Sequence, residues 1–285
     1  MKAETIPRIT SGRARRSRHF RTDLTRPALR IVIAMFSVEE RNAARAFVLR
    51  MASDDSRITA GALVGSIARG AEDRWSDLDL TFVVADDVPL GDVLLDWTRQ
   101  MDAALGAVPL WDVRVRSRTY RVFLLPGLLQ VDLSFTPASQ LRPAGPAFAL
   151  LFGQAGPTDV PAPPTSDHFF GLGVVQAIHG RRSIDRARYW QAEQAISQVR
   201  ECALSLACLQ YGLEPSHGRG FDDLPPDTLA PVAATLVASL EPDRLSAALE
   251  SAVELFLGQA VYVRELASRI EKDLRALSNT VARGE

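Results

Sequence analysis

Cysteine and lysine are both scarce in this 285-residue sequence. There are two cysteines and two lysines, against 31 arginines. Six residues of a helix span about 600°, so Cys202 and Cys208 would point to different sides and cannot form a disulfide with each other. We interpret both as core residues of a protein in a reducing compartment, and the arginine excess as the coding bias of a GC-rich genome.

Long apolar runs are also missing. None approaches the roughly 20 residues that span a bilayer, so we expect no membrane partner. The arginine-rich start lacks an apolar segment followed by a small-residue cleavage site, which favours a cytoplasmic location over secretion. A formal net charge of −1 disfavours nucleic acid as the main partner.

The composition changes along the chain and predicts four segments. Residues 1–36 hold nine basic and two acidic residues, and we expect a disordered Arg-rich leader. Weak attachment to nucleic acid and a translation start at Met35 are alternatives for this segment. An α/β domain is predicted over 37–136, a Pro-rich linker over 137–166 and a helical domain over 167–285.

The 37–136 segment alternates between helical and strand patterns, which predicts an α/β (α+β) domain with a small mixed sheet. Ser37 and Glu40 have the spacing of a capping box, which marks the start of the first helix. Apolar residues at helical spacing predict the longer helices, and short apolar runs between turn residues predict the strands. Helices are expected over 38–52 and 90–105, and strands over 58–64, 78–84, 113–115, 120–125 and 128–135.

Helical periodicity dominates the sequence after the linker. An all-α helical bundle domain of four or five helices is therefore expected to follow the α/β domain. Helices are expected over 167–181, 185–211, 227–239 and 243–279.

Two aspartates on one predicted strand carry the strongest chemical signal. Asp77 and Asp79 are separated by one residue, so both carboxylates point to one face of the strand, about 6.6 Å apart along the chain. Their mutual repulsion raises the pKa of each unless a cation lies between them. Hard oxygen ligands select Mg²⁺ or Mn²⁺, which makes a divalent metal site the prediction.

A small loop precedes these aspartates. Gly65 lets the backbone approach a ligand closely, and Ser66 lies at the start of a predicted helical turn, where free N–H groups and a hydroxyl can face an anion. The loop lacks the Gly-Lys-Ser/Thr ending of a P-loop. A Gly-Ser pair followed eleven residues after the glycine by Ser-Asp-x-Asp therefore predicts a different kind of triphosphate site.

Asp132 is the third carboxylate of the set. It shares a strand face with Gln130 and Ser134, while the apolar neighbours point the other way. A turn centred on Pro126-Gly127 would place Arg121 opposite Asp132. We hypothesise that Arg121 steadies this carboxylate or reaches a nucleotide phosphate, and a one-residue slip would remove the pairing.

These motifs resemble those of the DNA-polymerase-beta-like nucleotidyltransferase superfamily. The resemblance rests on Gly65-Ser66 with Arg69-Gly70, on Ser76-Asp77-Leu78-Asp79-Leu80 and on the strand aspartate Asp132, and it covers roughly residues 58–136. More narrowly, the chain is similar to antibiotic (aminoglycoside or lincosamide) nucleotidyltransferase-type proteins, in which a helical domain follows the catalytic one.

The resemblance implies a set of roles. The implied metal-binding and catalytic residues are Asp77, Asp79 and Asp132. The implied nucleotide-binding residues are Gly65, Ser66, Arg69 and Ser76. The co-substrate would be ATP or another nucleoside triphosphate with Mg²⁺ or Mn²⁺, and AMP would pass to a hydroxyl of a small-molecule acceptor. Glu193 in the helical half is a candidate general base, with an ion-paired surface glutamate as the alternative.

Other functions stay open at this stage. The acceptor could be a protein or an RNA end, as in toxin or antitoxin relatives, or the chain could be a nucleotide-binding regulator without turnover. The intact aspartate set disfavours a regulator. Residues 137–285 hold 17 acidic and 13 basic residues, which suits a cationic or polyhydroxylated acceptor. A homodimer that shares a site between subunits is a further alternative.

Overall fold

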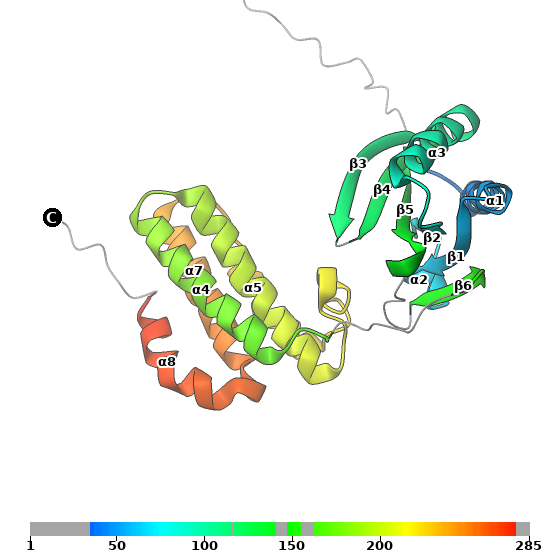
Figure 1. The fold of residues 1–285 in the computed structure, drawn as a ribbon. Coiled ribbons are helices and arrows are strands. Elements are labelled where there is room, and N and C mark those ends of the chain that lie inside the picture. The colour runs from blue at the N-terminus through cyan, green and yellow to red at the C-terminus, as the bar shows by residue number, and fades with distance from the viewer. Residues whose placement is uncertain (1–34, 116, 141–146, 155–161, 278–285) are drawn as a thin grey trace, which may run out of the picture. The chain divides into compact units, whose positions relative to one another are not determined.

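The structure, a computed structural model, describes the chain from Met35 to Leu277 with three gaps. The described residues are 35–115, 117–140, 147–154 and 162–277. They divide into two compact units, with the chain boundary between Pro161 and Ala162, and both units are drawn as ribbons in Figure 1. The leader predicted over 1–36 lies outside the described residues except for its last two.

The first unit is built on one six-stranded sheet with the order β3-β4-β5-β2-β1-β6. Its strands are β1 (Ile58–Val64), β2 (Leu78–Val84), β3 (Val108–Val115), β4 (Arg118–Leu125), β5 (Leu129–Pro137) and β6 (Phe148–Phe152). Among the described strands, β2 and β5 form a parallel pair and the other neighbours are antiparallel. The mixed sheet expected from the sequence is confirmed.

One strand was not expected. β6 falls inside the stretch 137–166 that the sequence analysis assigned to a Pro-rich linker, and it pairs with β1 at the edge of the sheet. Its five residues are short and lie among prolines and glycines, so their periodicity is too brief to stand out from a loop. The first unit therefore extends beyond residue 136.

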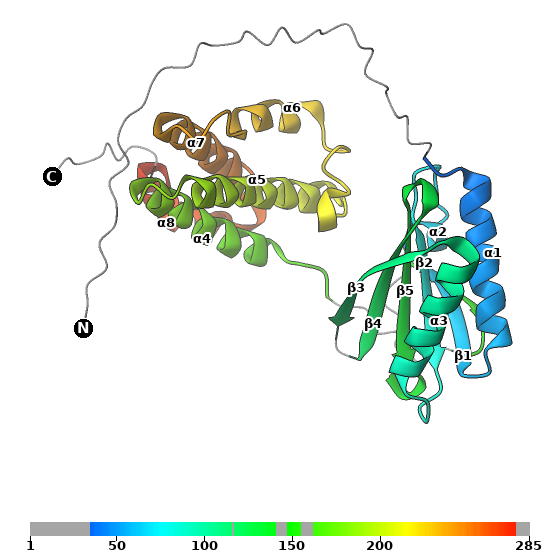
Figure 2. The same cartoon turned by 90° about the horizontal axis from the view of Figure 1, so that it is seen from above.

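Two helices, α1 (Val38–Asp54) and α3 (Leu90–Leu105), pack on the same apolar core as the sheet, and Figure 2 shows both beside its strands. The predicted capping box is present at the start of α1. Trp97 of α3 is fully buried, with ring centroids 4.9 Å from Phe82 and 5.1 Å from Phe135. The helices thus seal one face of the sheet and leave the other for polar residues.

The ordered core begins earlier than expected. Phe36, which the sequence analysis placed in the leader, is buried in this core. Its backbone N–H donates to the carbonyl of Gly127, with the N and O atoms 2.9 Å apart. The turn between β4 and β5 thereby fixes the chain just before α1.

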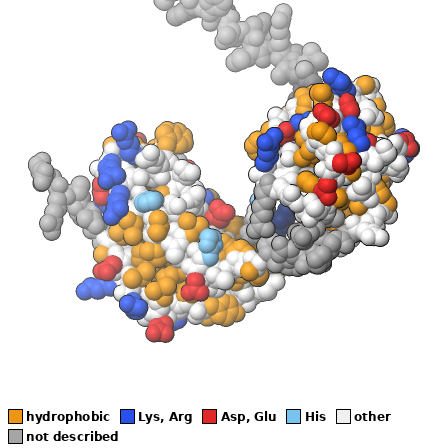
Figure 3. All heavy atoms as spheres, in the orientation of Figure 1, with side chains coloured by type: hydrophobic (Ala, Val, Ile, Leu, Met, Phe, Trp, Pro, Cys, Tyr) orange, Lys and Arg blue, Asp and Glu red, His pale blue; other side chains and the backbone are white. Residues whose placement is uncertain are grey.

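The elements of the second unit are helical throughout its described part. They are α4 (Ser166–Asp185), α5 (Tyr189–Tyr211), α6 (Pro226–Leu229), α7 (Pro242–Gly258) and α8 (Arg264–Ala276), with short 3₁₀ turns at Ser216–Gly218, Ala230–Thr235 and Val261–Val263. α4, α5, α7 and α8 contribute to a shared apolar core. Apolar side chains also reach the surface of this unit (Figure 3).

Three of the predicted helices differ from those in the structure because the chain bends. The helix expected over 227–239 is only the short helix α6 followed by the 3₁₀ turn Ala230–Thr235. The helix expected to begin at 185 begins at Tyr189, since Ala187 has a positive φ of 52° and interrupts it. The helix expected over 243–279 is two helices, α7 and α8, separated by a 3₁₀ turn. Periodicity cannot reveal such breaks, because apolar residues keep their spacing on both sides.

Cys202 and Cys208 are free thiols buried in α5, as expected. Burial raises the pKa of Cys202 to about 12. In the described part of the chain, no helix combines the length and the apolar character needed to cross a bilayer.

Asp55 joins α1 to the core and gives the fold a testable pH dependence. It accepts hydrogen bonds from Arg57 (2.8 Å to Nε) and from Trp97 Nε1 (2.9 Å). The bond with Arg57 contributes most to lowering the pKa of Asp55 to about 2. A lowered folded-state pKa stabilises the protein above the unfolded value near 3.8, and this stabilisation is lost as the pH falls towards 2.

We expect Asp55→Asn to lower the free energy of unfolding by on the order of 1–2 kcal/mol at pH 7. The difference in the free energy of unfolding between this variant and the wild type should disappear between about pH 4 and pH 2, because protonation then neutralises Asp55 in the wild type too. Urea unfolding at a series of pH values measures this. The exposed neighbour Asp54 supplies a control, since Asp54→Asn should change stability by less than about 0.5 kcal/mol. A gap that does not depend on pH would contradict the assignment.

Candidate active site

Three aspartates meet on the sheet face opposite the helices. Asp77 directly precedes β2, Asp79 is the second residue of β2, and Asp132 lies in β5. Because β2 and β5 are parallel neighbours, their register pairs Asp79 with Asp132. Carboxylate oxygens of the three residues lie within 4.8 Å of one another. The structure thus brings together the three acids that the sequence analysis selected.

The strand alternation explains why these acids can share one face. Leu78 and Leu80 are buried in the core on the helix side, so Asp79 points the opposite way. Two residues further along, on the face of the aspartates, Ser134 Oγ donates to Thr81 Oγ1 at 2.7 Å. Both hydroxyl residues are buried. Their bond ties β2 to β5 beside the carboxylates.

The electrostatics of the cluster favour a bound cation. Burial raises the pKa of Asp132, the Gln130 amide opposes the rise by hydrogen bonding, and the charge of Asp77 adds to it. The Gln130 Nε2 atom donates to both oxygens of Asp132 at 3.1 Å. The donor set consists of carboxylate oxygens, the hard ligands that Mg²⁺ and Mn²⁺ prefer. The residues present therefore fit a divalent metal.

Gly65 lies against this cluster. It follows β1, begins the single helical turn α2 (Gly65–Ala68) and has a positive φ of 70°. A Cβ at this position would come within 2.1 Å of Asp79 Oδ2. A side chain would therefore collide with the Asp79 carboxylate, and the positive φ would strain its backbone as well. The Gly-Ser loop and the aspartates form one structural site.

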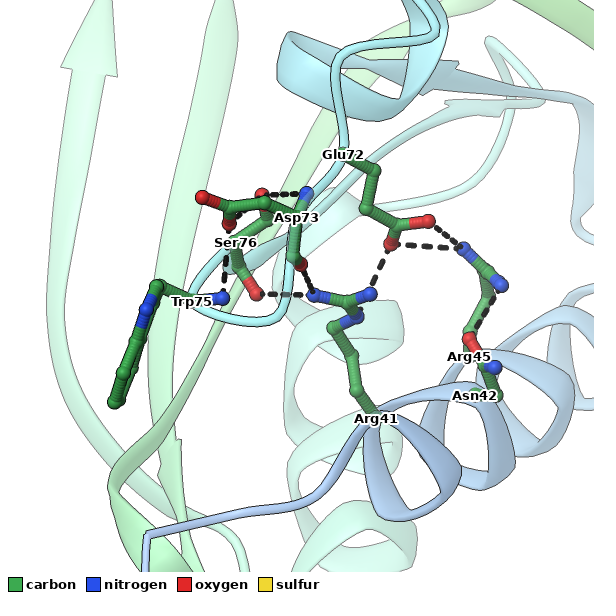
Figure 4. Close-up of polar contacts among 7 residues, drawn as sticks. All are labelled: Arg41, Asn42, Arg45, Glu72, Asp73, Trp75 and Ser76. Atoms are coloured by element: carbon green, nitrogen blue, oxygen red, sulfur yellow. Dashed lines mark hydrogen bonds and ion pairs between the residues drawn. The ribbon is translucent and has the colours of Figure 1, made fainter.

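The other predicted nucleotide-binding residues lie in α2 or in the loop that follows it. Ser66 lies in α2, and Arg69 follows this helix as its exposed C-cap residue. The Ser76 hydroxyl donates to the Asp73 carboxylate at 2.9 Å and accepts from the backbone N–H of Asp73 at 2.9 Å. Figure 4 shows this closed turn. Ser76 thus shapes the approach to Asp77, and its contact with a nucleotide stays a prediction.

The prediction for Arg121 is wrong. Asp132 pairs with Val122 and Arg121 pairs with Leu133 across the β4–β5 ladder. Directly opposite residues share a face, so Arg121 and Asp132 point to opposite faces of the sheet. Arg121 instead binds Asp112 through two bonds of 2.7 Å and donates to the Leu94 carbonyl of α3 at 2.9 Å.

The cause is one extra residue in the turn. The sequence analysis centred the turn on Pro126 and Gly127, whereas the loop also contains Leu128, so that Leu125 pairs with Leu129. Leu128 has a positive φ of 62°, a conformation that a bulky residue rarely adopts and that the sequence gives no reason to expect. The shift by one residue reverses the face of every β4 side chain.

Comparisons with known proteins give structural matches but no family. No family model and no curated protein matches the sequence. The solved structures similar to this chain include an aminoglycoside 6-adenyltransferase from Bacillus subtilis, with 13% identity, coverage of 85% of this chain and 99% of that one, and a TM-score of 0.36. They also include a nucleotidyltransferase-like protein from Exiguobacterium sibiricum 255-15, with 13% identity, coverage of 80% of each chain and a TM-score of 0.34.

The first of these proteins is named as an adenyltransferase and the second as nucleotidyltransferase-like. Their TM-scores lie below 0.5, so neither likeness serves as evidence for a shared activity. The functional evidence is the geometry of the carboxylates and the Gly-Ser loop.

The corrected register reveals residues that the sequence analysis missed. Asp79 pairs with Asp132, Asp132 with Val122, and Val122 with Trp111 of β3. These residues form one row across the face of the aspartates, and the row ends at an indole that is 64% exposed. With strands about 4.8 Å apart, Trp111 lies roughly 10 Å from Asp132. Tyr120 belongs to the next row on the same face, beside Ser134.

Glu193 lies in α5 of the second unit. Its carboxylate accepts a hydrogen bond from Ser197 Oγ at 2.8 Å, and Arg200 donates to the same hydroxyl at 2.9 Å. Arg200 also donates to the Thr235 carbonyl at 3.1 Å. This network ties α5 to the 3₁₀ turn Ala230–Thr235, and a role of Glu193 as a base stays a prediction.

Gly65→Ala should weaken Mn²⁺ binding by at least about tenfold, because the added methyl group displaces the Asp79 carboxylate. Gly70 is a matched control: its φ of 67° is also positive, and a Cβ there meets no described heavy atom within 4 Å. Both variants should lose about 1 kcal/mol of stability through backbone strain. Titration calorimetry with Mn²⁺ separates them, and equal affinities for the two variants would refute the contact.

Proposed function

We propose that this protein is a metal-dependent nucleotidyltransferase. It would move a nucleoside monophosphate, AMP from ATP, to a hydroxyl of a small-molecule acceptor such as an aminoglycoside- or lincosamide-like compound. The observation that carries the proposal is the cluster of three carboxylates packed against the Gly-Ser loop. The first unit would be the catalytic domain, and the second an accompanying helical bundle domain.

Asp77, Asp79 and Asp132 would hold Mg²⁺ or Mn²⁺. When bound, such ions neutralise phosphate charge and make a hydroxyl more acidic. Without a cation, three carboxylate oxygens within 4.8 Å of one another repel strongly. A bound divalent cation would offset this repulsion, which supports the cluster as a metal-binding site.

The remaining roles follow from position. Gly65 and Ser66 would place the triphosphate beside the aspartates, with Arg69 as a further phosphate contact. The acceptor oxygen forms a bond to the α-phosphorus, and the bond from that phosphorus to the bridging oxygen of pyrophosphate breaks. The hydroxyl proton passes to a carboxylate oxygen of Asp132. In this scheme the protein contributes mainly positioning and charge stabilisation.

The row that ends at Trp111 supports a place for the acceptor. An exposed indole, with Tyr120 and Val122 beside it, offers an apolar surface on the face of the carboxylates. A ring of the acceptor lying on this surface would bring its hydroxyl within reach of Asp132. Stacking on aromatic side chains suits sugar and heterocyclic rings, and it does not require a charged acceptor.

Asp77→Asn should reduce nucleotidyl transfer by on the order of 100-fold or more, because it removes one metal ligand. The fold should persist, since the substitution also relieves repulsion in the cluster. The assay combines labelled nucleotides, Mg²⁺ and a panel of aminoglycosides, lincosamides and cell extract. Asp102→Asn, in an exposed position on α3, is the control. Undiminished transfer in D77N would sink the metal assignment, and label found only on macromolecules would overturn the small-molecule acceptor.

Trp111→Ala should raise the KM for the acceptor about tenfold and leave the KM for the nucleotide unchanged. The loss corresponds to about 1.4 kcal/mol, within the range of one aromatic contact. Arg114→Ala changes the same strand on the opposite face and should leave both KM values within about twofold. Steady-state kinetics with each substrate varied in turn measures the effect. A rise confined to the nucleotide KM would instead place the base of the nucleotide on this surface.

A further inference from the structure

A buried arginine links helix α1 to the loop that leads into the aspartate cluster. Arg41, in the first turn of α1, is only 2% exposed. The loop runs from α2 to β2 and therefore connects the Gly-Ser turn to Asp77. Buried guanidinium groups are rare without a full set of partners, so the contacts of Arg41 indicate its purpose.

The guanidinium of Arg41 makes its two hydrogen bonds to backbone carbonyls of the loop, and it has one carboxylate neighbour. Its Nη1 atom donates to the carbonyl oxygen of Asp73 and to that of Ser76, the second at 3.0 Å. The Glu72 carboxylate lies 3.0 Å from Nε, and Nε makes no well-aligned hydrogen bond there. Figure 4 shows the Arg41 side chain extending from α1 to the carbonyl oxygens of the loop.

The hydrogen bond from Arg41 to the Ser76 carbonyl connects this arginine to the aspartate cluster. That carbonyl belongs to the peptide group that joins Ser76 to Asp77, so a hydrogen bond to it fixes the orientation of the backbone at which Asp77 begins. The loop itself is already closed by bonds between Asp73 and Ser76. Arg41 therefore anchors a preformed turn as one body and sets where that turn places Asp77.

Packing alone does not call for a charge here. A buried ion pair contributes little net stability compared with apolar residues of similar volume, because desolvation of the charges offsets their attraction. Arg45, one turn later, also pairs with Glu72 at 3.2 Å and bonds Asn42, so Glu72 keeps a cationic partner without Arg41. The feature unique to Arg41 within this cluster is its pair of bonds to loop carbonyls.

We propose that Arg41 is a positioning residue of the metal site, which holds the Asp73–Ser76 turn so that the Asp77 carboxylate stays with those of Asp79 and Asp132. The proposal rests on the proposed function, because it concerns the same carboxylates. Groups that orient metal ligands in this indirect way commonly change metal affinity by 10–100-fold when they are removed.

Arg41→Met and Arg45→Met form a matched pair for the test, with Mn²⁺ alone as the probe. We expect R41M to weaken Mn²⁺ binding about tenfold by titration calorimetry, and R45M to stay within twofold of the wild type. Without metal, hydrogen exchange of the Trp75 and Ser76 amides should speed up in R41M and not in R45M. Mn²⁺ affinity equal to the wild type in folded R41M would overturn the proposal.

Two further variants keep the outcome interpretable. If R41M does not fold, R41K retains the charge but offers a single donor group in place of the planar fork, and its Mn²⁺ affinity should fall severalfold. Unchanged affinity in folded R41K would then overturn the proposal. Failure of the wild type to bind Mn²⁺, or binding that D77N leaves intact, would refute the metal site of the proposed function instead.

Discussion

The structure of the first unit depends on tolerating the electrostatic repulsion among Asp77, Asp79 and Asp132. This repulsion arises from the parallel pairing of β2 with β5, because the register places Asp79 directly beside Asp132. The unfavourable charges are held in place by the apolar face of the same two strands, which packs on α1 and α3. Stability on one side of the sheet thus supports an electrostatically strained arrangement on the other, a pattern typical of active sites.

The cluster is supported at two of its residues. The Gly-Ser loop fits against Asp79 because Gly65 has no side chain. The loop before Asp77 is bound to α1 through Arg41. Both supports lie in backbone conformation and backbone hydrogen bonding. The aspartates therefore depend on residues that a list of acidic side chains would leave out.

Local rules sufficed for those parts of the site that depend on one strand at a time. The alternation of β-strand side chains placed Asp77 with Asp79, and Asp132 with Gln130, on polar faces, and the Ser37–Glu40 spacing located the start of α1. Features that depend on the conformation of a turn or on packing between distant segments were not predicted. The face of Arg121 was reversed by the conformation of Leu128, and β6 carries too few residues to show a period.

Arg41 illustrates the same limit. Its position directly after Glu39 and Glu40 in the first turn of α1 looks like that of an ordinary solvated arginine, and no local pattern reveals its burial. The row from Asp79 to Trp111 crosses four strands, so it appears only once all three registers are known. Sequence reasoning selected the three aspartates that the structure brings together, and the three-dimensional structure was needed to find what surrounds them.

The two thiols give the second unit a built-in reporter. Both cysteines of the chain lie in α5, in the interior of that unit, and burial raises the pKa of each. Since the thiolate is the nucleophile, alkylating reagents reach them only when the helices separate. The rate of alkylation would therefore time the opening of the second unit alone, while the first unit remains chemically silent. A cysteine introduced on an exposed strand could carry a spectroscopic label without removal of the native pair.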